Sequence, residues 1–308
     1  MKDLIDQLLD STIVFCFDRS GFRRHCPIPL ERFDLSAKRA IVTGGSSGIG
    51  LAVAKALINQ GMNCQIIARD IEKLQKSFFS KSVLSLAEYH SLDIADLKNL
   101  YFFAVNQVKD PIDLIVHNAG SMPNSLLITK DGFEQMFASQ VLGPFILTKT
   151  LADLGKLKKG CRIIFVSSGG MYLQKLDLSN LLFEKSSYNK YTGYANAKRA
   201  QVILAELFSE RYPEYLFSAM HPGWVDTPGV HFSMPFFTKL LNKRLRSVEE
   251  GADTILWLAT TEDYPNGKFW FDRKERKTTI LNFNKSSRAE CDSLWKYCES
   301  VFYSIKGI

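Results

Sequence analysis

The stretch Ala40-Ile41-Val42-Thr43-Gly44-Gly45-Ser46-Ser47-Gly48-Ile49-Gly50 decides the fold of this chain of 308 residues. Its apolar start, residues 40–43, predicts a strand, and the pattern over 47–60 predicts a helix directly after the glycines. Glycines at such a turn let the backbone approach a pyrophosphate, whose charge is stabilised by the free N–H groups and positive dipole end of the helix. The alternative is a plain turn, but the place of the glycines between a strand and a helix favours a dinucleotide site.

Beyond this unit, short apolar runs alternate with helical stretches along most of the chain. This alternation predicts repeated strand-helix-strand units and a parallel sheet with helices on both faces. The further strands are expected at 64–68, 89–92, 112–117, 162–167, 216–221 and 268–271, and the further helices at 71–79, 96–108, 133–154, 194–212 and 249–259. The predicted fold is therefore α/β, a Rossmann-type doubly wound sheet of about seven strands in a single domain.

No internal repeat, low-complexity linker or break in composition divides the chain. We therefore expect an N-terminal extension over 1–37, a main domain over 38–275 and a C-terminal extension with a helix over 276–308. Leucines near helical spacing predict an amphipathic helix over 2–17, which either packs on its own domain, the favoured alternative, or lies on a membrane. The apolar run 13–17 is too short for a signal peptide, and no window approaches the roughly 18 to 20 apolar residues of a membrane span.

The composition limits the class of protein. With 46% apolar and 23% charged residues, the chain is that of an ordinary globular domain and not of a disordered or collagen-like protein. Its six cysteines include no C-x-x-C pair, which favours a reducing compartment and no metal site. The net charge of +7 comes from Lys and Arg spread along the chain, which argues against nucleic acid as a partner. We expect a cytoplasmic protein, with peripheral membrane association as the alternative.

The end of the second predicted strand bears on the choice of nucleotide. An acidic residue there would accept a hydrogen bond from a free ribose 2'-hydroxyl and repel a 2'-phosphate. This chain instead has Ala68-Arg69. A guanidinium in place of a carboxylate favours the phosphate, so we expect NADP(H) to be preferred over NAD(H). The alternative is a surface Arg69 that pairs with Asp70.

A tyrosine and a lysine four residues apart are the candidate catalytic pair. Tyr194 and Lys198 share one helical face, and a nearby cation favours the phenolate of a group whose ordinary pKa is about 10. Such pairs also occur on helix surfaces by chance. Ser168 strengthens the interpretation because it follows the preceding strand, at the sheet edge where open parallel sheets bind ligands. A serine that only caps a turn is the alternative.

One histidine suggests a different chemistry. His221, Ser168 and Asp113 together could be taken for a hydrolase triad. The G-x-S-x-G elbow of such enzymes is absent, so His221, which precedes Pro222, is interpreted as structural.

The glycine spacing T-G-x-x-x-G-x-G, together with Ser168, Tyr194 and Lys198, resembles the short-chain dehydrogenase/reductase family over residues 38–275. The resemblance implies a nicotinamide cofactor, and hydride transfer between it and a carbonyl or alcohol. Tyr194 is then the general acid or base, Lys198 lowers its pKa and holds the ribose, and Ser168 polarises the substrate oxygen. A homo-oligomer is also implied.

The same resemblance implies a set of cofactor contacts at the ends of the strands. The acid after the third strand would contact the adenine, the Asn-Ala-Gly after the fourth would tie strands together beside the cofactor, and the Pro-Gly segment after the sixth would hold the carboxamide. The expected contacts are Thr43, Gly44, Ser46, Ser47, Gly48, Ile49, Gly50, Arg69, Asp93, Ile94, Asn118, Ala119, Gly120, Tyr194, Lys198, Pro222, Gly223, Val225 and Thr227.

Gln140 departs from the family pattern. Relatives have a catalytic Asn at this position, and Gln keeps the amide but moves it by more than about an ångström, through one added methylene. Either turnover is slower or a water fills the difference. The substitution also supports an alternative from another class, a nucleotide-binding sensor or scaffold with impaired catalysis.

Residues 228–247 are expected to form a lid over the substrate. This stretch is apolar with basic residues between, which favours a hydrophobic small molecule such as a lipid, retinoid or steroid-like carbonyl or alcohol. A contact between subunits, or with the core, is an equal alternative, and a surface that lies on a membrane is a third.

Overall fold

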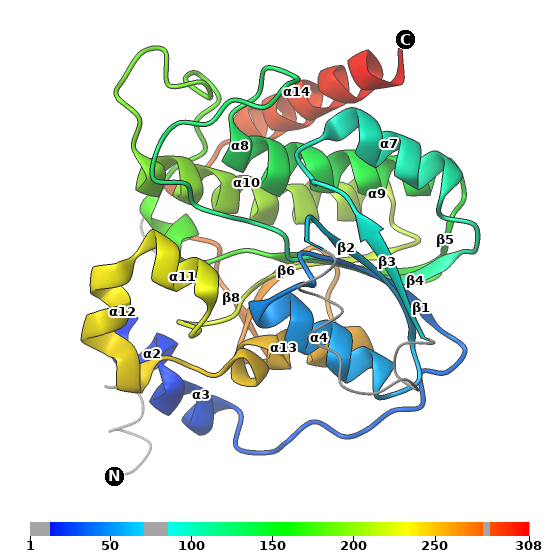
Figure 1. Ribbon diagram of the computed structural model, residues 1–308, viewed down its shortest axis with the longest axis vertical. Helices are drawn as coiled ribbons and strands as arrows, with labels where there is room; N and C mark the ends of the chain where they lie inside the picture. The colour runs from blue at the N-terminus through cyan, green and yellow to red at the C-terminus, as the bar shows by residue number, and fades with distance from the viewer. Residues whose placement is uncertain (1–12, 71–85, 280–283, 308) are drawn as a thin grey trace.

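The computed structural model describes residues 13–70, 86–279 and 284–307, and it confirms the predicted single α/β domain (Figure 1). One sheet holds all the described strands, in the order β3-β2-β1-β4-β5-β6-β7-β8. Every neighbouring pair is parallel except β7 and β8. The strands are β1 Arg39–Thr43, β2 Asn63–Ala68, β3 Ala87–Ser91, β4 Ile112–His117, β5 Leu157–Val166, β6 Leu216–His221, β7 Lys268–Phe271 and β8 Lys274–Arg276.

Helices cover both faces of the sheet, as Figure 1 shows. Successive strand residues point to opposite faces, so Ile41 packs with one core and Val42 with the other. On the Val42 side lie α4 Gly48–Ile58 and α13 Val248–Thr260. On the Ile41 side lie α7 Leu97–Asn106, α9 Gly143–Asp153 and α10 Lys190–Arg211, with α14 Arg288–Lys306 packed against them. The cores are therefore continuous and apolar, as a parallel sheet requires.

The predicted helix over 133–154 is interrupted in the structure. It consists of α8 Gln135–Phe137, the π-helical turn η1 Ala138–Leu142 and then α9. Pro144 explains the interruption, because it has no N–H to donate to the carbonyl of Gln140 four residues before it. The sequence correctly predicted a helical segment here and missed the π turn within it.

The antiparallel strand β8 was not predicted. It follows β7 through the two residues Asp272 and Arg273, whose φ angles of 51° and 58° are those of a tight hairpin turn. Such turns usually carry Asn-Gly or Asp-Gly, so Asp-Arg gave no signal. The predicted helix over 71–79 and most of the predicted helix over 2–17 lie outside the described residues.

Two short helices precede the sheet in the chain, α2 Ile13–Phe17 and α3 Arg19–His25. Figure 1 shows them beside the helices α11 Pro228–Ser233 and α12 Pro235–Leu241, far from them in sequence. Asp18 caps α3 by accepting a hydrogen bond from the backbone N–H of Gly21. Among the described residues, no helix is both long and apolar enough to cross a membrane. The six cysteines are free thiols.

Candidate active site

The glycine-rich turn after β1 has the backbone geometry of a phosphate cradle. Gly44 and Gly48 have φ angles of +69° and +55°, which side chains disfavour. A Cβ on Gly44 would also lie 2.8 Å from the Cα of Ala119. Ser47 is the N-cap of α4 but its side chain caps no backbone N–H, so the first turn of that helix keeps donors for an anion. The turn therefore fits a pyrophosphate.

Thr43 and Asn118 join the cradle to the end of β4. The hydroxyl of Thr43 accepts hydrogen bonds from the N–H groups of Asn118 and Ala119, each at 3.0 Å. The amide of Asn118 donates to the carbonyls of Thr43 and Gly44, at 3.1 Å and 3.3 Å. Thr43 is 1% exposed. The Thr43 hydroxyl therefore holds the Asn-Ala-Gly loop in place, and its contact with the cofactor stays a prediction.

Arg69 lies at the end of β2, where the adenosine ribose is expected. Its side chain is 70% exposed, and its Nη1 lies 3.9 Å from Oδ2 of Asp93. Asp93 also accepts a hydrogen bond from the N–H of Ala95. Arg69 and Asp93 thus stand together at this sheet edge, while Ile94 is 5% exposed and packs in the core beside Gly143.

Ser168, Tyr194 and Lys198 come together at the carboxyl end of β5. Ser168 lies close enough to the Tyr194 phenol to lower its pKa, and Nζ of Lys198 lies 5.4 Å from the centre of the Tyr194 ring. Strand and helix are fixed to each other because Nζ of Lys198 donates to the Val166 carbonyl at 2.8 Å. The hydroxyl of Ser167 donates to the Lys198 carbonyl, also at 2.8 Å.

Burial sets the proton affinities of this pair. It raises the pKa of the Tyr194 phenol, against the opposing effect of the hydrogen bond with Ser168. It also lowers the pKa of Lys198 to about 7. The cation expected to favour the phenolate is thus itself disfavoured by burial.

Gln140 lies next to this group, in the π turn. Its Nε2 donates to the carbonyl of Ser121 at 2.8 Å, and its buried Oε1 has no partner among the described residues. A Cβ on Gly120 would lie 3.1 Å from the Gln140 amide carbon. The side chain therefore supports the loop after β4, and does not bond Tyr194 or Lys198.

The Pro-Gly segment after β6 accepts a hydrogen bond from a buried arginine. Arg246 is 1% exposed and donates to the carbonyl of Pro222 at 3.4 Å. Its guanidinium would clash with any Cβ on Gly223, at 2.3 Å, and Gly223 has a φ of +82°. Thr227 lies next to the cradle, since a Cβ on Gly48 would be 3.2 Å from its methyl group. The Pro-Gly segment and the glycine-rich turn thus lie against each other.

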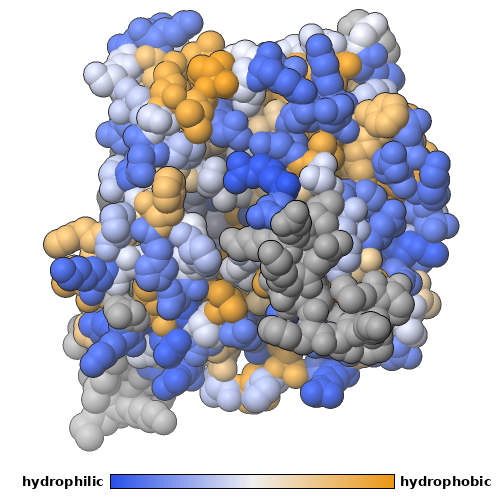
Figure 2. Space-filling view, in the orientation of Figure 1, coloured by the Kyte–Doolittle hydropathy of each residue, from blue (hydrophilic) through white to orange (hydrophobic). Residues whose placement is uncertain are grey.

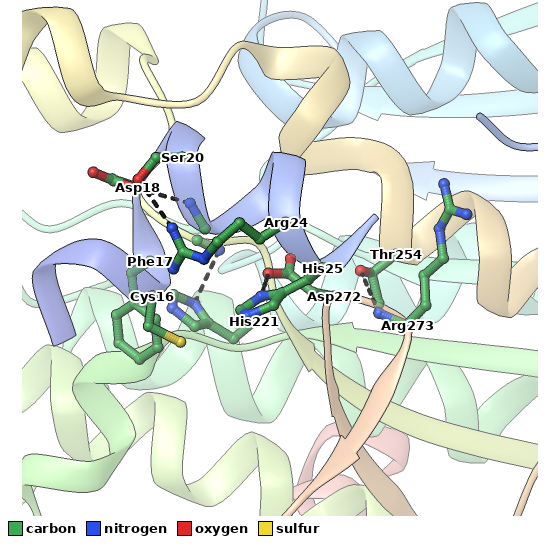
Figure 3. A network of polar contacts seen from close by, with 12 residues as sticks. Cys16, Phe17, Asp18, Ser20, Arg24, His25, His221, Thr254, Asp272 and Arg273 are labelled. Carbon is green, nitrogen blue, oxygen red and sulfur yellow. Dashed lines mark hydrogen bonds and ion pairs between the residues drawn. The ribbon is translucent and has the colours of Figure 1, made fainter. Parts of the chain in front are cut away.

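The same arginine joins the N-terminal segment to this segment. Arg246 donates to the carbonyls of Phe17 and Asp18, at 3.0 Å and 3.1 Å, and Trp224 donates its N–H to Phe17. Figure 3 shows Phe17 against His221, with ring centres 4.5 Å apart.

Sequence reasoning missed Arg246, Asp272 and His25. Figure 3 shows His25 against Asp272, with Nδ1 and Oδ2 2.7 Å apart. Asp272 also accepts from Arg246, at 2.5 Å and 2.9 Å. The available signal was Arg246 itself, a basic residue that follows an apolar stretch and is buried in the structure. Its partners come from distant segments, so the sequence did not indicate them.

His221 is structural, as expected. Burial lowers its pKa to about 3, so it is neutral, and its Nδ1 accepts from the N–H of Gly223 at 3.4 Å. Its Nε2 has no hydrogen-bond partner among the described residues. Asp113 lies at the start of β4, the opposite edge of the sheet, where it bonds the N–H of Arg39. No hydrolase triad forms.

The expected lid is α11 and α12, which lie at one side of the molecule in Figure 1. Ser233 donates to the carbonyl of Met122 at 3.0 Å, and Lys190 bridges Asn124 and the Ser233 carbonyl at 2.7 Å and 2.6 Å. The lid is thus tied to the loop after β4. It also presents strongly exposed apolar side chains, and Figure 2 shows a pale orange projection in this region. They are Phe232 at 67%, Phe236 at 79% and Leu240 at 71% exposure.

Several of the expected site residues have buried side chains. They are Thr43, Ile94, Gln140, Lys198 and Val225, at 1%, 5%, 0%, 4% and 3% exposure. The contact of each expected residue with a cofactor stays a prediction.

Comparison with known proteins finds one family. Residues 38–234 match the family model for short chain dehydrogenases. The chain is 36% identical over 302 residues to human dehydrogenase/reductase SDR family member 12, covering 94% of this chain and 95% of that protein. Human retinol dehydrogenase 13 is 29% identical over 268 residues, 82% of this chain and 80% of that one.

Solved structures agree on the fold. An angucycline C-6 ketoreductase with bound NADP superposes with a TM-score of 0.60 at 22% identity, covering 79% of this chain and 96% of that one.

Proposed function

Because the chain belongs to the short-chain dehydrogenase family, we propose that it is an NADP(H)-dependent oxidoreductase of apolar carbonyl or alcohol substrates, with Tyr194 as acid and base. Membership of the family supports an enzyme that works with a nicotinamide cofactor and a small molecule. The observation that carries the rest is the meeting of Ser168, Tyr194 and Lys198 at the same carboxyl edge of the sheet as the glycine-rich turn.

The nucleotide fits the residues present. Gly44 and Gly48 form a cradle that a side chain would fill, and the first turn of α4 would take the pyrophosphate. Arg69 supports a preference for NADP(H), because its loose pair with Asp93 leaves an exposed guanidinium for a 2'-phosphate. The similar ketoreductase structure contains NADP. The Pro222–Thr227 segment would face the nicotinamide.

The nicotinamide supplies the hydride, and the protein supplies the proton. In the reducing direction, Ser168 and Tyr194 donate hydrogen bonds to the carbonyl oxygen, and Tyr194 transfers its proton as the alkoxide forms. Lys198 stabilises the phenolate that remains when its own side chain is protonated, and burial lowers the pKa of that side chain to about 7. In the oxidising direction the phenolate removes the alcohol proton.

The mouth of the site supports an apolar substrate. Phe232 and Phe236 on the lid are exposed, and the lid is tied through Ser233 to the loop after β4, which itself exposes Leu127 and Ile128. A hydrophobic ligand would cover such side chains, with a gain of roughly 25 cal/mol per Å² of apolar area. Homo-oligomerisation and membrane attachment remain predictions, for sedimentation velocity and vesicle co-flotation to test.

The alternative of a sensor with impaired catalysis rested on Gln140. Its side chain bonds Ser121, while Lys198 and Tyr194 remain in contact, so that support is weakened. The deciding experiment is a screen of aldehydes and ketones with NADPH, run in parallel with Tyr194→Phe. We expect turnover by the wild type alone. Equal NADPH consumption by both proteins would show that Tyr194 is not the catalyst.

A further inference from the structure

Gln201 links Lys198 to the interrupted helix. Its side chain is 0% exposed, one turn after Lys198 on α10. Its Oε1 accepts a hydrogen bond from Nζ of Lys198 at 3.1 Å. Its Nε2 donates to the backbone carbonyl of Gln140 at 2.9 Å. Both ends of this buried amide are therefore used, one on the candidate catalytic lysine and one on the π turn.

The carbonyl of Gln140 needs such a donor because of the local sequence. In a regular helix it would accept from the N–H of residue 144, which is a proline. A buried carbonyl without a hydrogen-bond partner destabilises the folded protein. Gln201 supplies the donor from another helix, so any side chain at position 140 would present the same acceptor.

The contacts of Lys198 show what the other end of the amide does. Two carbonyl oxygens, of Val166 and of Gln201, accept from Nζ, which leaves one of the three ammonium hydrogens for another partner. Both acceptors are neutral. Among the described residues, burial alone shifts the pKa of Lys198, and the neighbouring titratable group is the Tyr194 phenol. A carboxylate in place of the amide would hold Nζ equally well but would neutralise the field that the cation exerts on the phenol.

We propose that Gln201 is a positioning residue for the reaction: it fixes Nζ of Lys198 beside Tyr194 without neutralising it, and relieves residue 140 of that task. The proposal rests on the proposed function. It explains why Gln140 can replace the Asn of relatives. The link from position 140 to Lys198 consists of the backbone carbonyl of residue 140 and the side-chain amide of Gln201, so it does not involve the side chain at position 140. A primary amide accepts a proton on neither end at neutral pH, so this link orients Lys198 and does not relay protons.

The test measures Lys198 directly and turnover separately. The protein is labelled with ¹³C at lysine Cε, the Lys198 signal is assigned by its loss in Lys198→Arg, and its shift is followed from pH 5 to 10. We compare the wild type with Gln201→Glu and Gln201→Leu. The control is Asn266→Leu, which likewise removes a side-chain amide with two hydrogen-bond partners. Those partners are the backbone groups of Phe217 and Tyr215, at the other end of β6.

Gln201→Glu should raise the Lys198 midpoint by about one pH unit or more, because a carboxylate favours the ammonium. Gln201→Leu should lower it, and should reduce kcat with NADPH about tenfold or more, with the pH profile of kcat displaced in the same direction. Asn266→Leu should change neither. Midpoints and pH profiles equal to the wild type in both Gln201 variants would overturn the proposal.

The two proposals fail in different ways. A wild type that turns over no carbonyl while the Lys198 midpoints move as expected would overturn the proposed function and leave the Gln201 contact as an orienting one only. If Gln201→Leu does not fold, Gln201→Glu, which keeps the shape of the side chain, still decides.

Discussion

Arg246 and Asp272 form a two-pronged ion pair in which both side chains are only 1% exposed. Burial alone would raise the pKa of Asp272, but hydrogen bonds from His25 and Arg246 outweigh it and lower that pKa. The pair joins the β7–β8 turn to the segment after β6, and Arg246 also donates a hydrogen bond to the carbonyl of Phe17. Three stretches far apart in sequence are thus held behind the candidate nicotinamide site.

Removing the acid of this pair should destabilise the fold strongly. We expect Asp272→Asn, which tolerates the positive φ at this position, to lower the free energy of unfolding by about 3 to 5 kcal/mol, because it leaves a buried guanidinium without a counter-charge. Urea denaturation at pH 7 measures it. The control is Arg288→Ala, which breaks the exposed pairs with Glu210 and Asp292 and should lower the free energy of unfolding far less. Equal losses in both would contradict the assignment.

Acid should destabilise the protein through its buried histidines. Burial lowers the pKa of both His117 and His221 to about 3, below the roughly 6.5 of an unfolded chain. Because the folded pKa is depressed, the stability they contribute is complete above about pH 6.5 and is lost as the pH falls toward 3. Each group should contribute a slope of about 1.4 kcal/mol per pH unit in that window.

His117→Leu should remove about half of this slope between pH 6 and pH 4, as measured by urea unfolding at several pH values. Thr148→Val is its control, since it breaks the same 2.8 Å hydrogen bond and keeps the histidine. An unchanged slope in His117→Leu would mean that other groups cause the acid destabilisation.

The side chain at position 140 should matter little for turnover. Since Gln201 contacts the backbone carbonyl there, Gln140→Asn should change kcat by less than about threefold, a difference of about 0.7 kcal/mol in barrier. Steady-state kinetics with NADPH and a carbonyl substrate measure it. A tenfold gain in kcat would show that the Asn of relatives provides something that Gln140 does not.

Arg69→Ala should weaken NADPH binding and spare NADH. Loss of a charged hydrogen bond costs about 1.5 to 3 kcal/mol, so the Kd for NADPH should rise about tenfold to a hundredfold. Fluorescence titration with both nucleotides measures it. Arg39→Ala, which removes another surface arginine at the opposite edge of the sheet, should change neither Kd. Unchanged NADPH affinity in Arg69→Ala would contradict the NADP(H) preference.

Local sequence patterns were enough to predict the fold class and the family. Periodicity placed the parallel strands and most of the described helices, and the glycines at 44 and 48 marked a turn whose φ angles the structure shows to be positive. Tyr194 and Lys198 lie four residues apart on one helix, so their contact follows from helix geometry alone. These features are local, and the geometry of a local feature follows from the residues within it.

The contacts that support the site became visible in the folded chain and could not be predicted from local patterns. Gln201 meets Gln140 across 61 positions, and Arg246 meets Phe17 across 229. In both contacts a side chain bonds a backbone carbonyl, a group that every residue has, so the sequence holds no mark of the partner. The hairpin that places Asp272 opposite Arg246 likewise lacks the usual turn residues. The candidate catalytic residues can thus be identified from the sequence, while their positioning depends on which distant backbone groups folding brings near them.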